Sequence, residues 1–76
     1  MDELRKYIQN ELKELIFKTV DFDEPLMSTK VLDSILLVDL IVSIEEYTDI
    51  TIPTGEVNED NFETINKMNE YIVSLK

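Results

Sequence analysis

The serine at position 34 is the side chain best placed for covalent chemistry in this sequence. It stands in Leu32-Asp33-Ser34-Ile35, at the head of a long helical pattern of apolar and acidic residues. The backbone N–H groups of a first helical turn have no partner inside the helix, and they stabilise an anion, a phosphate most readily. Taken alone, an Asp-Ser pair at a helix start is in most proteins only a cap, so this pair needs support from the rest of the chain.

The composition excludes the usual kinds of catalytic and metal site. The 76 residues include no cysteine and no histidine, so a disulfide, a thiolate metal site and a Ser-His-Asp arrangement are all impossible. A calcium loop beginning at Asp21-x-Asp23 fails by spacing, because Leu26 takes the glycine position and Leu32 takes that of the closing carboxylate. We therefore expect a protein that is not an enzyme, with no catalytic residue and no metal ligand.

The formal net charge of −10 limits the partners of the chain. An excess of carboxylates repels nucleic acids and anionic lipids, and it favours salt-sensitive encounters with basic patches on other proteins. A hydrophobic content of 43% argues against disorder, no apolar run is long enough to span a membrane, and the amphipathic beginning is unlike a signal peptide. The expectation is a soluble cytoplasmic domain that binds no nucleic acid and does not insert into membranes. Salt or divalent cations are expected to raise its melting temperature.

Hydrophobic periodicity predicts three long helices and one short helical turn. Asp2, Asp33 and Thr64 are suitable N-caps. The expected elements, in chain order, are a helix over 2–19, a loop over 21–31, a helix from 33 or 34 to 48, an extended connector over 50–53, a short turn within 54–63 and a helix over 64–75.

Apolar residues at helical spacing define the faces that we expect to be buried. In the first helix they are Leu4, Ile8, Leu12, Leu15, Ile16 and Thr19. In the second helix they are Val38, Ile41, Ile44 and Tyr47, with Leu37 and Leu40 at the flanks. In the last helix they are Ile65, Met68, Ile72 and Leu75. The connecting segments add Phe22, Leu26, Met27, Val31, Ile50, Ile52, Val57 and Phe62.

The second helix carries more apolar and acidic residues than its own stability explains. Glu45 and Glu46 lie near its carboxyl end, where negative charge opposes the helix dipole. A solvated acidic face and ordinary core residues are the plain alternatives. We expect a docking surface for partner proteins beside Ser34. Its residues are Ile35, Leu36, Asp39, Val42, Glu45 and Glu46.

The order of these elements, together with their motifs, resembles the carrier-protein family: acyl, peptidyl and D-alanyl carriers that bear a phosphopantetheine arm. Asp33-Ser34-Ile35 is similar to the family's Asp-Ser-Leu attachment motif. Two segments resemble the D-alanyl carriers in particular: Val31-Leu32-Asp33-Ser34 and Phe62-Glu63-Thr64. The second of these segments is similar to the Trp-Asp-Thr element of those carriers. Leu36 and Leu37 depart from that subtype, which usually has small or polar residues just after the serine.

The resemblance implies an all-α fold: a small four-helix bundle of acyl-carrier-protein type, with three longer helices and one short one, over residues 1–76 as a single carrier domain. It implies 4′-phosphopantetheine attached to Ser34, with Asp33 as the motif residue and helix cap. A thioester-linked cargo would then be passed between enzymes. The implied partners are a phosphopantetheinyl transferase, an acyl- or aminoacyl-activating ligase and downstream transferases, acting on a monomer.

Several alternatives stay open from the sequence. D-Alanine for cell-envelope (teichoic acid) modification has the most motif support as cargo, followed by a fatty or polyketide acyl chain and then a nonribosomal amino acid. An unmodified acidic helical adaptor is the alternative of another class. A Ser34→Ala variant separates the adaptor from a carrier of any cargo, because an adaptor keeps its function and a carrier loses it.

Overall fold

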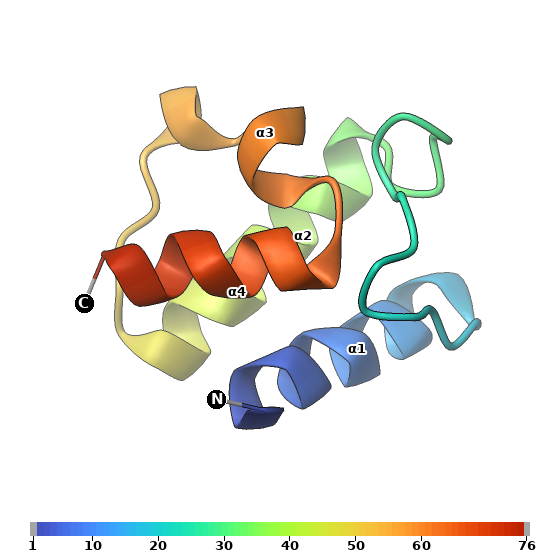
Figure 1. The fold of residues 1–76 in the computed structure, drawn as a ribbon, viewed down its shortest axis with the longest axis horizontal. Helices are drawn as coiled ribbons and strands as arrows, with labels where there is room; N and C mark the ends of the chain where they lie inside the picture. The colour runs from blue at the N-terminus through green and yellow to red at the C-terminus, as the bar shows by residue number, and fades with distance from the viewer. Residues whose placement is uncertain (1, 76) are drawn as a thin grey trace.

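The computed structural model describes residues 2–75 and contains helices only, with no strand among those residues (Figure 1). This confirms the predicted all-α bundle of three longer helices and a short one, to which the structure adds a single 3-10 turn. The elements are α1 (Asp2–Ile16), α2 (Ser34–Thr48), η1 (Thr54–Glu56), α3 (Glu59–Phe62) and α4 (Ile65–Ser74).

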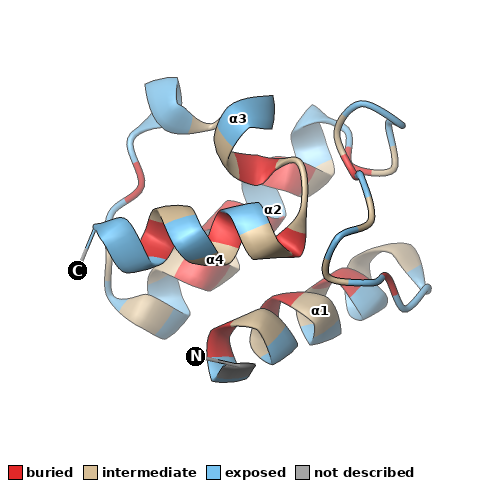
Figure 2. Ribbon diagram, in the orientation of Figure 1, coloured by how far each residue is buried: buried red, intermediate tan, exposed pale blue. Residues whose placement is uncertain are grey.

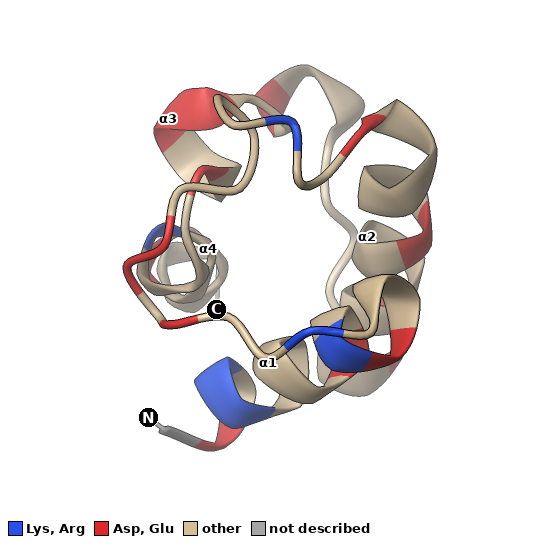
Figure 3. Ribbon diagram, turned by 90° about the vertical axis from the view of Figure 1, so that its right-hand side faces the viewer, with Lys and Arg blue, Asp and Glu red and all other residues tan. Residues whose placement is uncertain are grey.

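One core joins all the longer helices. Helix α1 packs against both α2 and α4, and α3 packs on α4. The buried parts of the helices face the interior (Figure 2). In the view turned by 90°, α2 and α4 lie on opposite sides of the molecule and α1 lies across the base (Figure 3). The fully or nearly fully buried side chains are Leu4, Ile8, Leu12, Val20, Leu26, Leu32, Leu37, Leu40, Ile41, Ile44, Ile52, Phe62, Ile65, Met68 and Ile72.

Helix α1 ends at Ile16, which is earlier than the predicted end at Thr19. Phe17 adopts φ 58°, in the left-handed region, while its N–H still donates to the carbonyl of Lys13 at 2.8 Å. A left-handed residue of this kind stops a helix and turns the chain. Thr19 is therefore exposed rather than buried, and Val20 reaches the core instead. The expected cap at Asp2 concerns a side chain outside the part of the molecule that the structure describes.

The inward face of helix α2 is rotated from the predicted one. Ile41 and Ile44 are buried as predicted, together with the flanking Leu37 and Leu40. The prediction was wrong for Val38, which is 60% exposed, and for Tyr47, which is 49% exposed. Because α2 is apolar around much of its circumference, more than one stripe satisfies helical spacing. The stripe that packs under α1 runs through positions 37, 40, 41 and 44.

Tyr47 is instead held at the edge of the α1–α2 contact. Its ring stacks on that of Tyr7, with centroids 3.9 Å apart and planes 11° apart. The Tyr7 hydroxyl donates to the backbone carbonyl of Ser43 at 3.1 Å and also reaches Glu11. Burial raises the pKa of Tyr7, and the negative charge of Glu11 raises it further. The stack fixes the second half of α2 against the first half of α1.

The last helix begins as predicted, and the short helix α3 lies within the predicted 54–63 segment. Thr64 accepts a hydrogen bond from the Lys67 N–H at 3.1 Å, which caps α4, and Asn58 caps α3 in the same way through the Asn61 N–H at 3.2 Å. The prediction that Leu75 belongs to the buried stripe was wrong. Leu75 is 39% exposed, because α4 ends one residue earlier.

Candidate functional site at the start of helix α2

The site is the first turn of α2. Asp33 is the N-cap: its Oδ1 accepts a hydrogen bond from the Leu36 N–H at 2.8 Å, and its carbonyl accepts one from the Leu37 N–H at 2.9 Å. Ser34 is the first residue of the helix, and it is exposed. Within residues 2–75, no hydrogen bond occupies the N–H groups of Ser34 and Ile35. These donors therefore face solvent beside the Ser34 hydroxyl, in the position where a helix start favours an anion.

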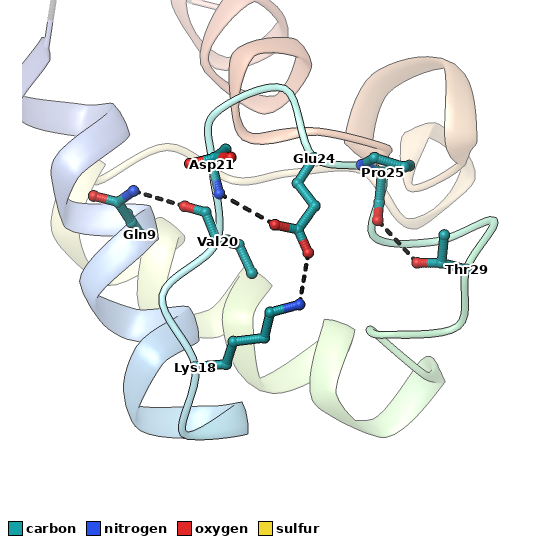
Figure 4. A network of polar contacts seen from close by, with 7 residues as sticks. All are labelled: Gln9, Lys18, Val20, Asp21, Glu24, Pro25 and Thr29. Atoms are coloured by element: carbon teal, nitrogen blue, oxygen red, sulfur yellow. Dashed lines mark hydrogen bonds and ion pairs between the residues drawn. The ribbon is translucent and has the colours of Figure 1, made fainter.

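The first half of the preceding loop is held by polar contacts near the end of α1 (Figure 4). Lys18 Nζ lies 2.9 Å from Glu24 Oε2, and the other carboxylate oxygen accepts from the Asp21 N–H at 3.4 Å. Gln9 on α1 donates to the carbonyl of Val20 at 2.6 Å. The hydrogen bond from Lys18 and the one from Asp21 lower the pKa of Glu24. The loop is thus an ordered structure rather than a free tether.

A second set of contacts fastens this loop to α1 and α4 together. Asn66 on α4 accepts from Arg5 on α1 at 3.0 Å, donates to Asp23 at 2.5 Å, and donates through its backbone N–H to the carbonyl of Phe22 at 3.0 Å. The Arg5 guanidinium also lies 5.3 Å from the centre of the Phe22 ring. Asp23 is therefore held by an amide of α4, a role that no local pattern in the sequence indicates.

Glu63 is a residue of the site's support that sequence reasoning missed. Its carboxylate accepts hydrogen bonds from the N–H groups of Leu26, Met27 and Ser28, in the second half of the loop. In the sequence, Glu63 stands out only as the middle residue of Phe62-Glu63-Thr64. Because its partners lie more than thirty positions away, no local spacing could reveal them.

An open groove runs from Ser34 along α2. Its volume is about 450 Å³, and it lies between α2 and the segment from Ile52 to Val57. The rim is exposed at Ser34, Val38, Val42 and Thr54, while Leu37, Ile41 and Ile52 form a buried apolar floor. The exposure of Val38, which contradicted the predicted buried face, follows from its place on this rim.

The six residues expected to dock partners lie in three different settings. Ile35 is 72% exposed and Val42 is 47% exposed, and Asp39 and Glu46 are also exposed. Leu36 is half-buried and packs against the core. Glu45 is half-buried, and its carboxylate accepts the Ile52 N–H at 2.7 Å. This bond gives Glu45 a structural reason to stand near the carboxyl end of α2.

Helix α2 contains acidic residues and no basic residue (Figure 3). Across the part of the chain that the structure describes, no three carboxylates gather closely enough to hold a metal ion. Within residues 2–75, no helix combines the length and the apolar composition needed to cross a bilayer. The site therefore offers one hydroxyl, free backbone donors, an apolar groove and an acidic helix face.

Comparison with known proteins identifies the class to which this arrangement belongs. The family model described as "Phosphopantetheine attachment site" matches residues 2–72. The D-alanyl carrier protein of Streptococcus mutans serotype c is 44% identical over 54 residues, which are 71% of this chain and 68% of that protein. That of Streptococcus suis strain 98HAH33 is 35% identical over 75 residues, 96% of this chain and 95% of that protein. That of Streptococcus sanguinis strain SK36 is 37% identical over 67 residues, 86% and 85% of the two chains.

The chain belongs to the phosphopantetheine-attachment family: it is a carrier protein, and phosphopantetheine is its covalent cofactor. The resemblance seen in the sequence is confirmed, including its particular likeness to D-alanyl carriers. The carrier interpretation is favoured over the unmodified adaptor. The site fits the group, because an exposed hydroxyl at a helix start leaves room for a bulky phosphodiester and offers donors to its charge.

Proposed function

We propose that Ser34 carries the phosphopantetheine and that the cargo held on its thiol is D-alanine. The observation that supports Ser34 most strongly is its place as the exposed first residue of α2, with Asp33 capping the same turn. Asp33 leaves the Ser34 side chain out of the cap, so the hydroxyl is available to a partner enzyme. The thiol of the attached group supplies the thioester chemistry, and this chain supplies the attachment point.

The attachment step is a phosphoryl transfer from coenzyme A. The Ser34 oxygen forms a bond to the phosphorus of the phosphopantetheine phosphate, and the bond from that phosphorus to adenosine 3′,5′-bisphosphate breaks. The Ser34 proton passes to a base of the transferase, and Mg²⁺ at the transferase balances the charge. The product phosphodiester would lie beside the N–H groups of Ser34 and Ile35, which would stabilise its charge.

The groove beside Ser34 gives the arm a surface on which to lie. Its apolar floor at Leu37, Ile41 and Ile52 suits the methyl groups and chain of the arm, and its rim remains open to solvent. An open groove suits a short polar cargo such as an aminoacyl group better than a long chain that must be hidden from water. This agrees with the relatives, which are named D-alanyl carrier proteins.

Partner enzymes supply the catalysis, and this chain supplies no catalytic residue. The proposed partners are a phosphopantetheinyl transferase, a ligase that activates D-alanine, and downstream transferases of cell-envelope modification. They would bind through the exposed Ile35, Asp39, Val42 and Glu46, with basic residues facing the carboxylates. The half-buried Leu36 and Glu45 would contribute only the parts of their side chains that remain exposed. One core joins the helices, which supports a single domain. We further propose that the chain acts as a monomer in the cytoplasm.

Intact-mass spectrometry tests both parts of the proposal. The protein is incubated with coenzyme A, Mg²⁺ and a promiscuous phosphopantetheinyl transferase, and peptide mapping locates the added mass. One phosphopantetheine on Ser34 is expected, absent in Ser34→Ala and retained in Ser74→Ala, an exposed serine at the end of α4. An unmodified wild type beside a working control carrier would overturn the assignment.

The cargo is tested on the modified protein. A D-alanine-activating ligase with ATP and D-alanine is expected to add one alanyl mass that hydroxylamine removes, as a thioester requires. L-Alanine serves as the control for the stereochemistry of the cargo. Acylation by a fatty acyl or malonyl donor in place of D-alanine would assign the cargo to the fatty or polyketide class.

A further inference from the structure

One carboxylate outside the site joins the last helices to the loop that leads to Ser34. Glu63 lies directly after α3, and its Oε1 accepts from three successive backbone N–H groups, at 3.1 Å from Leu26, 2.6 Å from Met27 and 2.9 Å from Ser28. The backbone carbonyl of Glu63 also accepts from the Leu26 N–H at 2.8 Å. Successive N–H groups that converge in this way form a concave anion-binding site. Here the protein fills that site with its own carboxylate.

Glu63 is ionised at neutral pH in this setting. Hydrogen bonding from the Ser28 side chain and from the Ser28 N–H lowers the pKa of Glu63, and the N–H groups of Met27 and Leu26 act in the same direction. Bonds from neutral N–H groups to an ionised acceptor are stronger than bonds to a neutral one. The charged carboxylate is therefore the form that holds these three residues.

The segment held by Glu63, here called the 26–32 loop, ends where the site begins. The Leu32 N–H donates to the Leu26 carbonyl at 2.9 Å and closes the loop, and both of these leucines are buried. The next two residues are the cap Asp33 and Ser34. A displacement at the base of the loop therefore moves the start of α2.

The middle of the 26–32 loop lacks apolar contacts of its own. Ser28, Thr29 and Lys30 are exposed, and Lys30 has φ 60°, in the left-handed region that side chains other than glycine seldom occupy. Such a conformation persists only where its surroundings determine it. Hydrogen bonds at the base of the loop are able to do so: the Met27 and Ser28 N–H groups donate to the Glu63 carboxylate, and the Thr29 hydroxyl donates to the Pro25 carbonyl at 2.8 Å.

We propose that Glu63 is a positioning residue for the modification of Ser34. Its carboxylate keeps the 26–32 loop in the one conformation that presents Asp33 and Ser34 to the phosphopantetheinyl transferase. This rests on the proposed attachment at Ser34, and it makes the presentation of the site depend on a residue outside α2, between α3 and α4. Without the carboxylate, only a fraction of molecules present the site correctly, so the apparent affinity for the transferase falls to that fraction of its wild-type value.

The test compares transfer kinetics in Glu63→Ala, Glu63→Gln and wild type, each well below its melting temperature. If about a tenth of Glu63→Ala molecules present the site, KM for the carrier rises about tenfold while kcat stays within about twofold. Glu63→Gln retains an acceptor oxygen without the charge, so its KM is expected between the two. Glu59→Ala, at an exposed acid of α3, is the matched control for loss of one charge, and its KM is expected to equal that of wild type. An unchanged KM in Glu63→Ala would overturn the proposal.

Hydrogen exchange separates positioning from general stability and does not depend on Ser34. In Glu63→Ala, exchange of the Met27 and Ser28 amides is expected to accelerate at least tenfold, while amides inside α1 and α4 keep their protection. Equal acceleration throughout the chain would reduce Glu63 to a stabilising residue and overturn the positioning role. Failure of the wild type to be modified at Ser34 would instead overturn the proposed function, and this inference with it.

Discussion

The carboxylate of Glu45 accepts a 2.7 Å hydrogen bond from the N–H of Ile52, seven positions later in the chain. Between them, α2 ends at Thr48, and Asp49 follows as a left-handed cap with φ 58°, its N–H donating to the Glu45 carbonyl. Glu45 therefore fixes both the end of its helix and the direction in which the connector leaves. The connector then brings Ile52 to the floor of the groove beside Ser34.

Replacement of Glu45 by alanine is expected to lower the free energy of unfolding by about 1.5 kcal/mol, because the partly buried Ile52 N–H loses a charged acceptor. Urea denaturation followed by circular dichroism measures this. Glu46→Ala is the control, since Glu46 is the next residue, carries the same charge and is exposed. We expect it to change stability by less than about 0.5 kcal/mol. Equal losses in the two variants would show that the hydrogen bond contributes nothing.

Loss of the cap at the start of α2 is expected to cost less. Asp33→Ala removes the acceptor of the Leu36 N–H, which costs about 1 kcal/mol and lowers the melting temperature by about 4–8 °C in a domain of this size. Asp39→Ala removes the same charge from an exposed position inside α2 and serves as the control. Asp33→Asn retains an acceptor, so its melting temperature should stay near that of wild type, and a loss as large as that of Asp33→Ala would contradict the capping role.

The short helix α3 contributes to stability through one side chain. Phe62 is fully buried and lies 5.6 Å from the Tyr71 ring of α4, measured between ring centres. Phe62→Ala is expected to destabilise the fold by about 3–5 kcal/mol, a large part of the total for a small domain. Val73→Ala, at a side chain that is 46% exposed, is the comparison and should cost less than about 1 kcal/mol. Calorimetry of both variants measures the difference, and a loss below about 1 kcal/mol in Phe62→Ala would contradict the packing described.

The Lys18–Glu24 ion pair is expected to make stability depend on acid. The hydrogen bond from Lys18 lowers the pKa of Glu24 below its ordinary 4.5 in the folded state. Folded protein then binds fewer protons than unfolded protein, so the contribution is present above that value and is lost as the pH falls through the folded pKa. The melting temperature of wild type should exceed that of Glu24→Gln at pH 7, and the gap should close as the pH falls through the folded-state pKa of Glu24. Glu14→Gln, at an exposed acid of α1, is the control for the removal of one negative charge. If the difference in melting temperature between wild type and Glu24→Gln persisted in acid, the ion pair would not be its cause.

Salt is expected to stabilise the protein because its net charge is −10. Raising the ionic strength from about 10 mM to about 150 mM shortens the screening length from about 30 Å to about 8 Å and weakens repulsion among carboxylates. The melting temperature at pH 7 should rise. Near pH 4, where many carboxylates are protonated, the same salt step should have a smaller effect. No rise at pH 7 would argue against repulsion on the acidic surface.

The sequence was sufficient for the presence of the helices, for the caps of α2 and α4 and for the family, because these depend on local patterns. Asp33 and Thr64 could be recognised as caps from the residue type and the apolar pattern that follows. The predicted buried face of α1 was also correct from Leu4 to Leu12, since only one face of that helix is apolar. The end of α1 was not, because Phe17 adopts a left-handed conformation that its residue type does not announce.

The supporting contacts of the site depend on residues that are distant in the chain. Glu63 meets Met27 and Ser28, and Asn66 meets Arg5 and Asp23. Acids and amides have no periodicity that could pair them over such separations, whereas a core position is marked by its spacing. The inward face of α2 was predicted only in part for a related reason, since apolar residues around much of the helix leave the choice of buried face to the neighbouring elements.

The stacked rings of Tyr7 and Tyr47 give the unlabelled protein an intrinsic spectroscopic probe of the contact between α1 and α2. The chain contains no tryptophan, so its intrinsic fluorescence and much of its near-ultraviolet dichroism come from tyrosine. Two of its three tyrosines lie face to face across α1 and α2, and their spectra couple only while the helices remain in contact. Separation of these two helices, on unfolding or in a complex, can thus be followed in the native sequence without a dye.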